Sequence, residues 1–378
     1  MIDDLIRERG PITVAAFMEL ALYHPEFGYY ARASQRSGRA GDFFTSVDVG
    51  PIFGELLEVQ IEEMFRKLTT EPTEHTETTP AAVRSVNSVV AIDFVEAGAG
   101  NGRLSTDILR AAKREHPDFY NALHLHLVEA SAAARADQRT TLGDVADRLT
   151  SSCGALPESF EGVLIANELL DAFPVHQVVM REEGLREVYV TGPKGPALQL
   201  AEGAPSTPRL QQYLDAVGAR LQPGWRAEIN LNAIDWIREA ARRMRRGFMI
   251  LIDYGHEARD LYSASHSAGT LTTFSGHRSA DDAWLHKPGE QDITAHVDFT
   301  SVRAAAEAEG METLGFLDQT YFLLGILNRS ARLSTSASGA LKTLLLPGGL
   351  GSTHKVLLLG KHVGRPALLG CSFRVRVT

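Results

Sequence analysis

The chain has little cysteine and no long apolar run. Its two cysteines, Cys153 and Cys371, are too few and too far apart for a disulfide framework or a zinc knuckle, which favours a reducing compartment. No uninterrupted apolar stretch reaches the roughly 20 residues that a membrane span needs. The N-terminus carries acidic residues where a signal peptide needs basic ones. We therefore expect a soluble cytoplasmic protein without membrane insertion.

Positive charge is also scarce. The 38 lysines and arginines are outnumbered by 47 aspartates and glutamates, which gives a net charge of -9. Nucleic-acid binding depends on clustered lysine and arginine, so we expect no nucleic-acid partner. An acidic surface suits a cationic partner, although a solvated surface explains most of these charges equally well. Composition leaves open whether the protein forms a homodimer.

Apolar periodicity divides the 378 residues into four parts. Residues 1–88 predict a helical cap that ends in a polar loop. Residues 89–173 alternate short apolar strands with helices, the pattern of a parallel sheet covered on both faces. Residues 174–225 contain a hairpin around Glu182-Glu183-Gly184 and a helix, and we interpret them as an inserted substrate lobe. Residues 226–378 complete the core, with a helical insertion before the last strand. The expected core strands span 89–95, 123–128, 162–166, 248–252, 311–317 and 355–359.

The strongest local signal lies where the first core strand gives way to a helix. It reads Glu96-Ala97-Gly98-Ala99-Gly100-Asn101-Gly102, and glycines at alternate positions let a backbone approach a ligand closely. The third glycine comes one position too early for the dinucleotide fingerprint, and Glu96 would repel a pyrophosphate. The loop therefore favours S-adenosylmethionine, a cationic nucleoside without phosphate whose charged end Glu96 can contact. A simple turn is the competing interpretation.

Glu129 ends the second core strand, where an acidic side chain accepts hydrogen bonds from ribose hydroxyls. Nicotinamide enzymes use an acid there too, so Glu129 indicates an adenosine ribose and leaves the cofactor undecided. A solvated strand end is the structural alternative. The expected cofactor-binding residues are Glu96, Gly98, Gly100, Asn101, Gly102, Glu129 and Ser46.

A second polar group follows the strand at 162–166. Asn167, Glu168 and Asp171 should face the reactive end of the cofactor, because the carboxyl ends of parallel strands border the ligand site. We expect Glu168 and Asp171 to share one side of a helical turn and to grip a guanidinium, whose planar donor fork matches two carboxylates. Asn167 would hold the donor or the loop. A helix N-cap with acidic residues near the positive end of the macrodipole is the alternative.

Other chemistries lack a signal. His124 and His126 alternate on one strand without a third ligand at metal spacing, so we expect no metal site. Neither a G-x-S-x-G elbow nor an H-E-x-x-H motif occurs, which leaves hydrolase activity without support.

Ordered blocks along nearly the whole chain resemble one family. They include Leu22-Tyr23-His24-Pro25, Gly41-Asp42-Phe43, the glycine loop, Asn167-Glu168-Leu169-Leu170-Asp171, Asp253-Tyr254-Gly255, and Asp292 through Phe299. With these blocks the chain resembles the MidA-like S-adenosylmethionine-dependent methyltransferases, a family with a mitochondrial member that methylates an arginine of a complex I subunit.

The resemblance implies a Rossmann-like seven-stranded methyltransferase sheet, S-adenosylmethionine as donor, and a protein acceptor with a target arginine. It maps the family's loop glycines onto Gly98, Gly100 and Gly102, and its ribose acid onto Glu129. The segment from Gly41 to Ser46 would close over the cofactor. The loop departs from the family's usual Glu-Leu-Gly-Pro-Gly-Arg-Gly. A nicotinamide oxidoreductase and a non-catalytic assembly chaperone that keeps the cofactor site remain the alternative functions.

Overall fold

The computed structural model describes residues 1–31, 45–70, 91–192, 198–275, 278–279, 283–328, 338–346, 351 and 353–373. Most of the segment expected to close over the cofactor, residues 41–44, and most of the expected polar loop, residues 71–88, lie outside these residues. No helix in the described ranges is long and apolar enough to cross a membrane.

The core is a Rossmann-like sheet with the strand order β4-β3-β2-β5-β10-β16-β15. Its strands are β2 (Ile92–Ala97), β3 (Leu123–Val128), β4 (Leu149–Cys153), β5 (Phe160–Asn167), β10 (Met244–His256), β15 (Glu312–Asp318) and β16 (His354–Lys361). The first five pair in parallel, whereas β16 runs antiparallel to both of its neighbours. A short strand, β14 (Val297–Asp298), pairs in parallel with the end of β10. This topology confirms the expected seven-stranded methyltransferase sheet.

Apolar strands in a covered sheet send alternate side chains to opposite faces. Phe94 of β2 and Ile250 of β10 belong to one buried cluster, and their neighbours Val95 and Leu251 belong to the other. Helices that supply the first cluster are α3 (Ile52–Thr70), α4 (Arg103–Glu115), α5 (Pro117–Ala122), α6 (Ala132–Leu142), α11 (Gln319–Leu327) and α12 (Ser338–Leu345). The second cluster packs against α8 (Leu231–Arg243) and α10 (Phe299–Ala308). The helices α11 and α12 lie between β15 and β16 in the chain, as the sequence predicted.

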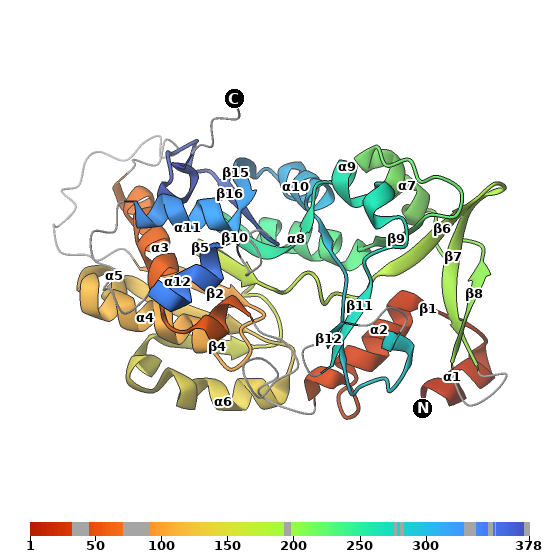
Figure 1. Ribbon diagram of the computed structural model, residues 1–378. Helices are drawn as coiled ribbons and strands as arrows, with labels where there is room; N and C mark the ends of the chain where they lie inside the picture. Colours follow the sequence, from red (N-terminus) through yellow and green to blue (C-terminus); the bar gives the residue numbers. More distant parts are fainter. Residues whose placement is uncertain are drawn as a thin grey trace.

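A second body lies beside the core, to the right in Figure 1. Its sheet consists of β1 (Ile12–Thr13), β6 (His176–Arg181), β7 (Gly184–Thr191), β8 (Gln199–Gly203) and β9 (Arg226–Ile229). The β6–β7 hairpin confirms the expected one. Because β1 precedes residue 174 and β9 follows residue 225, this sheet includes segments beyond the inserted lobe that the sequence suggested, and the proposed domain boundaries stay a prediction.

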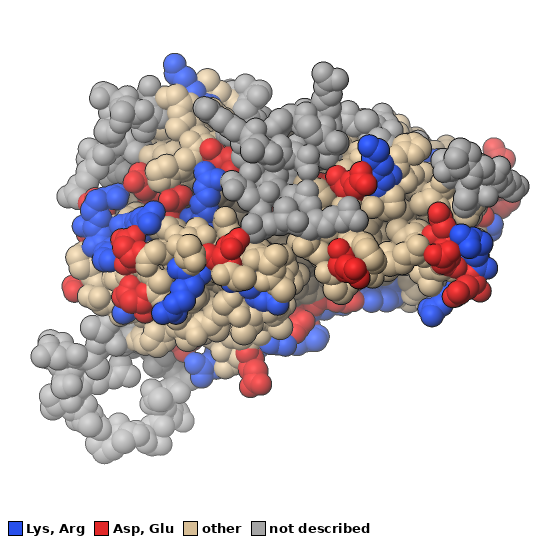
Figure 2. Space-filling view, turned by 90° about the horizontal axis from the view of Figure 1, so that it is seen from below, with Lys and Arg blue, Asp and Glu red and all other residues tan. Residues whose placement is uncertain are grey.

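Further short elements lie outside these two sheets. The helices are α1 (Ile2–Arg9), α2 (Val14–Tyr23), α7 (Arg209–Val217) and α9 (Ala258–Leu261), and the strands β11 (Thr272–Ser275), β12 (Arg278–Ser279) and β13 (Asp292–Thr294) form a small sheet. The 3-10 turns are η1 (Tyr29–Ala31), η2 (Ser46–Val49), η3 (Gly143–Arg148), η4 (Ala264–His266), η5 (Ala283–Leu285) and η7 (Leu369–Cys371). Acidic and basic side chains are interspersed on the face shown in Figure 2, without a large patch of one sign.

Candidate functional site

The glycine loop connects the end of β2 to the start of α4. Gly98, Gly100 and Gly102 have φ angles of 72°, 50° and 85°, a region that other residues rarely adopt. A Cβ atom at Gly98 would lie 3.0 Å from the Leu169 side chain, and one at Gly102 would lie 3.2 Å from Leu127. At Gly100 a Cβ atom would meet nothing within 4 Å. The loop therefore packs closely at its two ends and leaves open space beside the Cα atom of Gly100 in the middle.

Glu129 joins this loop to the end of β3. Its carboxylate accepts a hydrogen bond of 2.8 Å from the Gly100 N–H and one of 2.7 Å from the Ser131 N–H. Gln138 donates to the Gly100 carbonyl oxygen over 2.8 Å, so both sides of the loop are held. Asn101 lies half-buried at the apex. Glu129 therefore lies next to the open space beside Gly100, and the ribose contact that the sequence suggested stays a prediction.

Glu96 is only 5% exposed and faces the first turn of α4. One carboxylate oxygen accepts the Ser105 N–H over 3.1 Å and also the Ser105 hydroxyl. Burial raises the pKa of Glu96 to about 7, against the opposing effect of these hydrogen bonds. The carboxyl group thus supports the loop from inside, and its contact with the charged end of the cofactor stays a prediction.

We expect Glu96→Gln to flatten the pH dependence of stability in the cofactor-free protein. The pKa of Glu96 rises from its ordinary value of 4.5 to about 7, so the folded state holds this proton more tightly than the unfolded state. The resulting contribution to the free energy of unfolding is complete below the pKa of Glu96 in the unfolded state. It disappears as the pH rises through the pKa of Glu96 in the folded state. At about 1.4 kcal/mol per pKa unit, roughly 3 kcal/mol is lost between about pH 4.5 and 7. Urea unfolding over this range measures it. Glu8→Gln, at an exposed position, is the control, and equal slopes in both variants would refute the assignment.

The second group forms at the turn after β5. Glu168 has a φ of 50°, which is unusual for a residue with a side chain and is often found at functional sites. Its N–H donates to the Ile252 carbonyl of β10 over 2.8 Å. Residues 168–173 form bends and a turn, not a helix. The helical turn that the sequence predicted for Glu168 and Asp171 is therefore wrong, and so is the helix N-cap alternative.

The Glu168 carboxylate, 11% exposed, is held by three different parts of the chain. One oxygen accepts from the Ser46 N–H and from the Asn167 side-chain amide, each over 3.3 Å. The same oxygen lies 3.5 Å from Nε2 of His354 on β16. Ser46 is fully buried, and its hydroxyl donates to Gln319 at the start of α11 over 3.2 Å. Ser46 thus lies beside Glu168, and its contact with the cofactor stays a prediction.

Asp253 is a site residue that the sequence reasoning did not select. One of its oxygens accepts the N–H groups of Leu169, Leu170 and Asp171, at 3.2, 2.8 and 3.3 Å, and so shapes the turn. Burial, with a smaller contribution from the Glu168 charge, raises the pKa of Asp253 to about 7 against the lowering effect of its hydrogen bonds. Its position at the carboxyl end of β10, next to β5, was the available signal.

Asp171 lies at the centre of a group of carboxyls. Its side chain is buried, and its pKa is raised well above the ordinary value by burial first and then by Asp253, Asp292 and Glu168. In the described part of the chain, neither Asp171 nor Asp253 has a lysine or arginine within 4 Å. We call Glu168, Asp171, Asp253 and Asp292 the carboxyl cluster. Its like charges disfavour full ionisation unless a cation enters.

Two tyrosines from the N-terminal segment border this group. The Tyr30 hydroxyl donates to Asp292 over 2.8 Å, and the Tyr23 hydroxyl donates to the Ala172 carbonyl over 3.1 Å. Their ring centroids are 5.3 Å apart. Tyr23, Tyr30 and Asp292 were not selected from the sequence as site residues, although Tyr23 and Asp292 lie within the blocks that carry the family resemblance. The structure adds an aromatic edge to the acidic site.

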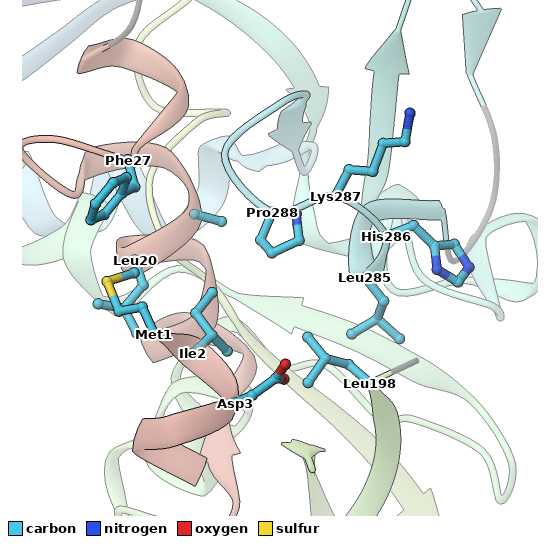
Figure 3. A pocket seen from close by; sticks show the side chains of 11 residues that line it. Met1, Ile2, Asp3, Leu20, Phe27, Leu198, Leu285, His286, Lys287 and Pro288 are labelled. Carbon is cyan, nitrogen blue, oxygen red and sulfur yellow. The ribbon is translucent and has the colours of Figure 1, made fainter. Parts of the chain in front are cut away.

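A pocket of about 540 Å³ lies elsewhere, between the N-terminal helices and the segment after η5 (Figure 3). Met1, Ile2, Leu20 and Leu285 make much of its wall apolar, while Lys287 stands at its edge. It contains none of the residues that the sequence selected, so the candidate site remains at the carboxyl ends of the core strands.

Comparison with known proteins tests these interpretations. Residues 75–317 match a family described as "Putative S-adenosyl-L-methionine-dependent methyltransferase". The protein arginine methyltransferase NDUFAF7 of Danio rerio is 30% identical over 365 residues, which cover 89% of this chain and 78% of that protein. The homologue of Drosophila melanogaster is 27% identical over 97% of this chain and 86% of its own. A crystal structure from Burkholderia thailandensis with bound S-adenosyl-homocysteine matches with a TM-score of 0.84 and 27% identity, covering 100% of this chain and 94% of that one.

S-adenosylmethionine, the methyl donor predicted from the glycine loop, agrees with these matches. A relative over the full chain holds the demethylated product, which favours S-adenosylmethionine over the nicotinamide alternative. The chain's own residues fit such a ligand, because the space beside Gly100 is open and Glu129 lies next to it. The extent of the match and the conserved topology of the core establish the identity: this chain belongs to the family of S-adenosyl-L-methionine-dependent methyltransferases, and S-adenosylmethionine is its cofactor.

Proposed function

We propose that the protein methylates an arginine side chain of a partner protein, and that Glu168 and Asp171 hold the guanidinium. The observation that carries the proposal is the carboxyl cluster around buried Asp171, in which neither Asp171 nor Asp253 has a lysine or arginine within 4 Å in the described part of the chain. Burial first, and then the neighbouring carboxyls, raise the pKa of Asp171. A guanidinium would favour its ionised form and would match two carboxylates with its donor fork. The names of the relatives, protein arginine methyltransferases, support the same acceptor class.

We assign donor binding and acceptor binding to two groups of residues. In our proposal Gly98, Gly100, Asn101 and Gly102 with Glu129 hold the donor, and Glu96 and Ser46 stabilise the neighbouring backbone. When bound, S-adenosylmethionine supplies a methyl carbon already activated by its sulfonium. The chain therefore needs to align an acceptor nitrogen and to take up the proton which that nitrogen loses.

Glu168 and Asp171 are suited to these two tasks. Glu168 is anchored by Ser46 and Asn167, so its free oxygen keeps a fixed direction. Asp171 has a raised pKa in the empty site, and a bound guanidinium favours its ionised form, so its carboxylate is assigned to take up the proton that the acceptor nitrogen loses. The tyrosines Tyr23 and Tyr30 border the group and would limit its access to water.

We extend the proposal to a subunit of respiratory complex I as acceptor, which rests on the family resemblance. The names of the relatives place those proteins in mitochondria, and the cytoplasmic location expected here stays a prediction. Mass spectrometry of arginine methylation in cells with and without the gene tests both steps. We expect one methylated arginine peptide to disappear in the deletion and to return with the parent gene but not with Glu168→Gln.

A non-catalytic assembly chaperone is the alternative. It predicts that Glu168→Gln restores the cellular phenotype of the deletion, and that no arginine peptide changes. That result would overturn the methylation proposal and leave cofactor binding intact.

A further inference from the structure

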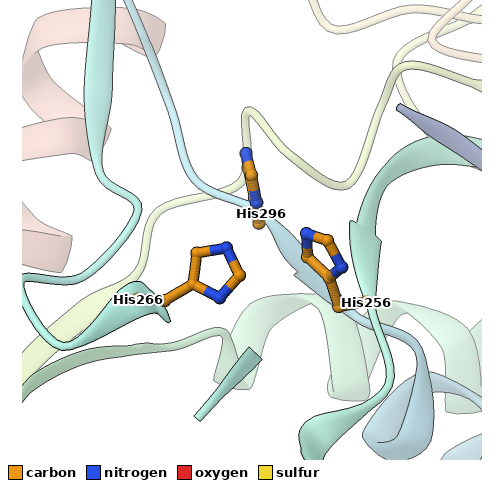
Figure 4. Close-up of side chains that lie close together, drawn as sticks. All are labelled: His256, His266 and His296. Atoms are coloured by element: carbon orange, nitrogen blue, oxygen red, sulfur yellow. The ribbon is translucent and has the colours of Figure 1, made fainter. Parts of the chain in front are cut away.

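Three histidines from separate segments converge outside the site described above. His256 ends β10, His266 ends η4, and His296 lies between β13 and β14. One ring nitrogen of each lies within 4.8 Å of those of the other two. The ring centroids are 4.9 Å apart for His256 and His266, 5.3 Å for His256 and His296, and 5.9 Å for His266 and His296. Figure 4 shows the three rings around a common space.

The fold itself brings these side chains together. The parallel pairing of β10 with β14 sets Gly255 opposite Val297, which places His296 beside the end of β10. The His296 N–H donates to the Thr270 hydroxyl over 3.1 Å, and this bond joins it to the segment that follows His266. The cluster is therefore fixed by backbone pairing and does not depend on flexible side chains alone.

Two of the three rings present the chemistry of metal ligands. Nδ1 of His296 is buried and has no hydrogen-bond partner, which is costly for a polar atom unless something binds there. Nδ1 of His266 lies 3.0 Å from the Asp260 carbonyl oxygen and can only donate to it. That hydrogen bond leaves Nε2 of His266 with its lone pair free, the arrangement in which a carbonyl orients a ligating histidine.

We propose that His256, His266 and His296 form a site for a divalent transition metal, with Zn²⁺ as the best match. Three imidazoles and one open position suit Zn²⁺, which binds histidine nitrogen at about 2.0–2.1 Å in a tetrahedral arrangement. Ligand nitrogens in such a site are about 3.4 Å apart, so the rings close by roughly 1 Å when the ion enters. His266, half-buried in a three-residue turn, can supply that movement.

A metal here would act on the neighbouring acceptor site through the backbone. His296 follows Ala295, whose N–H donates to the Asp171 carbonyl over 3.0 Å. An ion that joins the end of β10 to this segment would hold the turn of Asp171 in place. The role assigned to the metal is structural, and the proposal does not depend on arginine being the acceptor.

Calorimetry on the full chain, freed of metal by a chelator, tests the proposal. We expect one Zn²⁺ ion per chain and a higher melting temperature with Zn²⁺. His266→Ala and His296→Ala should each weaken binding by roughly 100-fold, since loss of an outer-shell partner alone costs 10–100-fold. His124→Ala removes an exposed histidine of β3 and should bind as the parent does. Equal affinity in all four proteins, or no binding by the parent, would overturn the proposal.

A second measurement covers the case in which His296→Ala fails to fold. Co²⁺ added to the parent protein should give the intense visible absorption of a tetrahedral site, and His266→Ala, at a half-buried turn, should lose it while keeping its circular dichroism. A weak octahedral spectrum in the parent would count against the site. Both readouts are independent of methyl transfer, so failure of the metal proposal and failure of the proposed function are distinguishable.

Discussion

Gly100→Val is expected to abolish binding of S-adenosylmethionine and S-adenosylhomocysteine, with a loss of affinity of at least roughly 100-fold. Gly100 has a φ of 50°, where a β-branched side chain is strained by roughly 1–2 kcal/mol. A Cβ atom there meets no protein atom within 4 Å, so the new side chain would occupy the open space that the ligand needs. Strain would also disturb the hydrogen bond from the Gly100 N–H to Glu129. Titration calorimetry with either ligand measures the loss.

A matched glycine separates exclusion of the ligand from backbone strain. Gly218, the C-cap of α7, has a φ of 69° and equally open surroundings, but it lies in the second body. Gly218→Val should lower the melting temperature about as much as Gly100→Val and leave ligand affinity unchanged. Retained affinity in Gly100→Val would show that the cofactor does not approach the loop at this position.

The sequence predicted strands that carry a run or an alternation of apolar residues, including the edge strand β15, and missed β4, which carries neither. The expected strand 123–128 coincides with β3, because its apolar residues are bounded by a helix and an acidic turn. β10 is longer than the expected 248–252, since it begins in a basic stretch that resembles the end of a helix. β4, with the sequence Leu-Thr-Ser-Ser-Cys, is an edge strand without buried residues and therefore has no apolar signal.

The candidate site was predictable where strand ends determine it and not where distant segments meet. Glu129 and Glu168 follow core strands, so strand prediction alone placed them at the ligand edge. The hydrogen bond from Tyr30 to Asp292 joins residues 262 positions apart, and no local sequence pattern predicts such a contact. The turn of Asp171 was predicted as helical, because the side chain of Asp253, 82 positions or more away, supplies the hydrogen bonds that decide its shape.

Glu168→Gln and Asp171→Asn should each reduce methyl transfer strongly and leave cofactor affinity within a few-fold of the parent. The proposed cofactor contacts come from the loop after β2 and from Glu129, whereas these carboxyls follow β5. An amide keeps the size of the side chain but cannot ionise beside a guanidinium or accept its proton. A charge-assisted hydrogen bond is worth roughly 1.5–3 kcal/mol, which is about one to two decades in rate if the contact tightens in the transition state.

Stability distinguishes this role from a purely structural one. Burial first, and then the neighbouring carboxyls, raise the pKa of Asp171, so Asp171→Asn removes a buried acid whose ionised form is costly and should keep or raise the melting temperature while turnover falls. A residue that only shaped the turn would behave in the opposite way, with lower stability and normal turnover. Glu58→Gln is the control for the change from an acid to an amide. Glu58 is a buried glutamate of α3 that hydrogen-bonds to His116, and it does not belong to the carboxyl cluster. Melting temperature, cofactor affinity and arginine methylation, measured on the same preparations, distinguish the catalytic role from the structural one. Unimpaired methylation in both variants would show that Glu168 and Asp171 do not belong to the catalytic site.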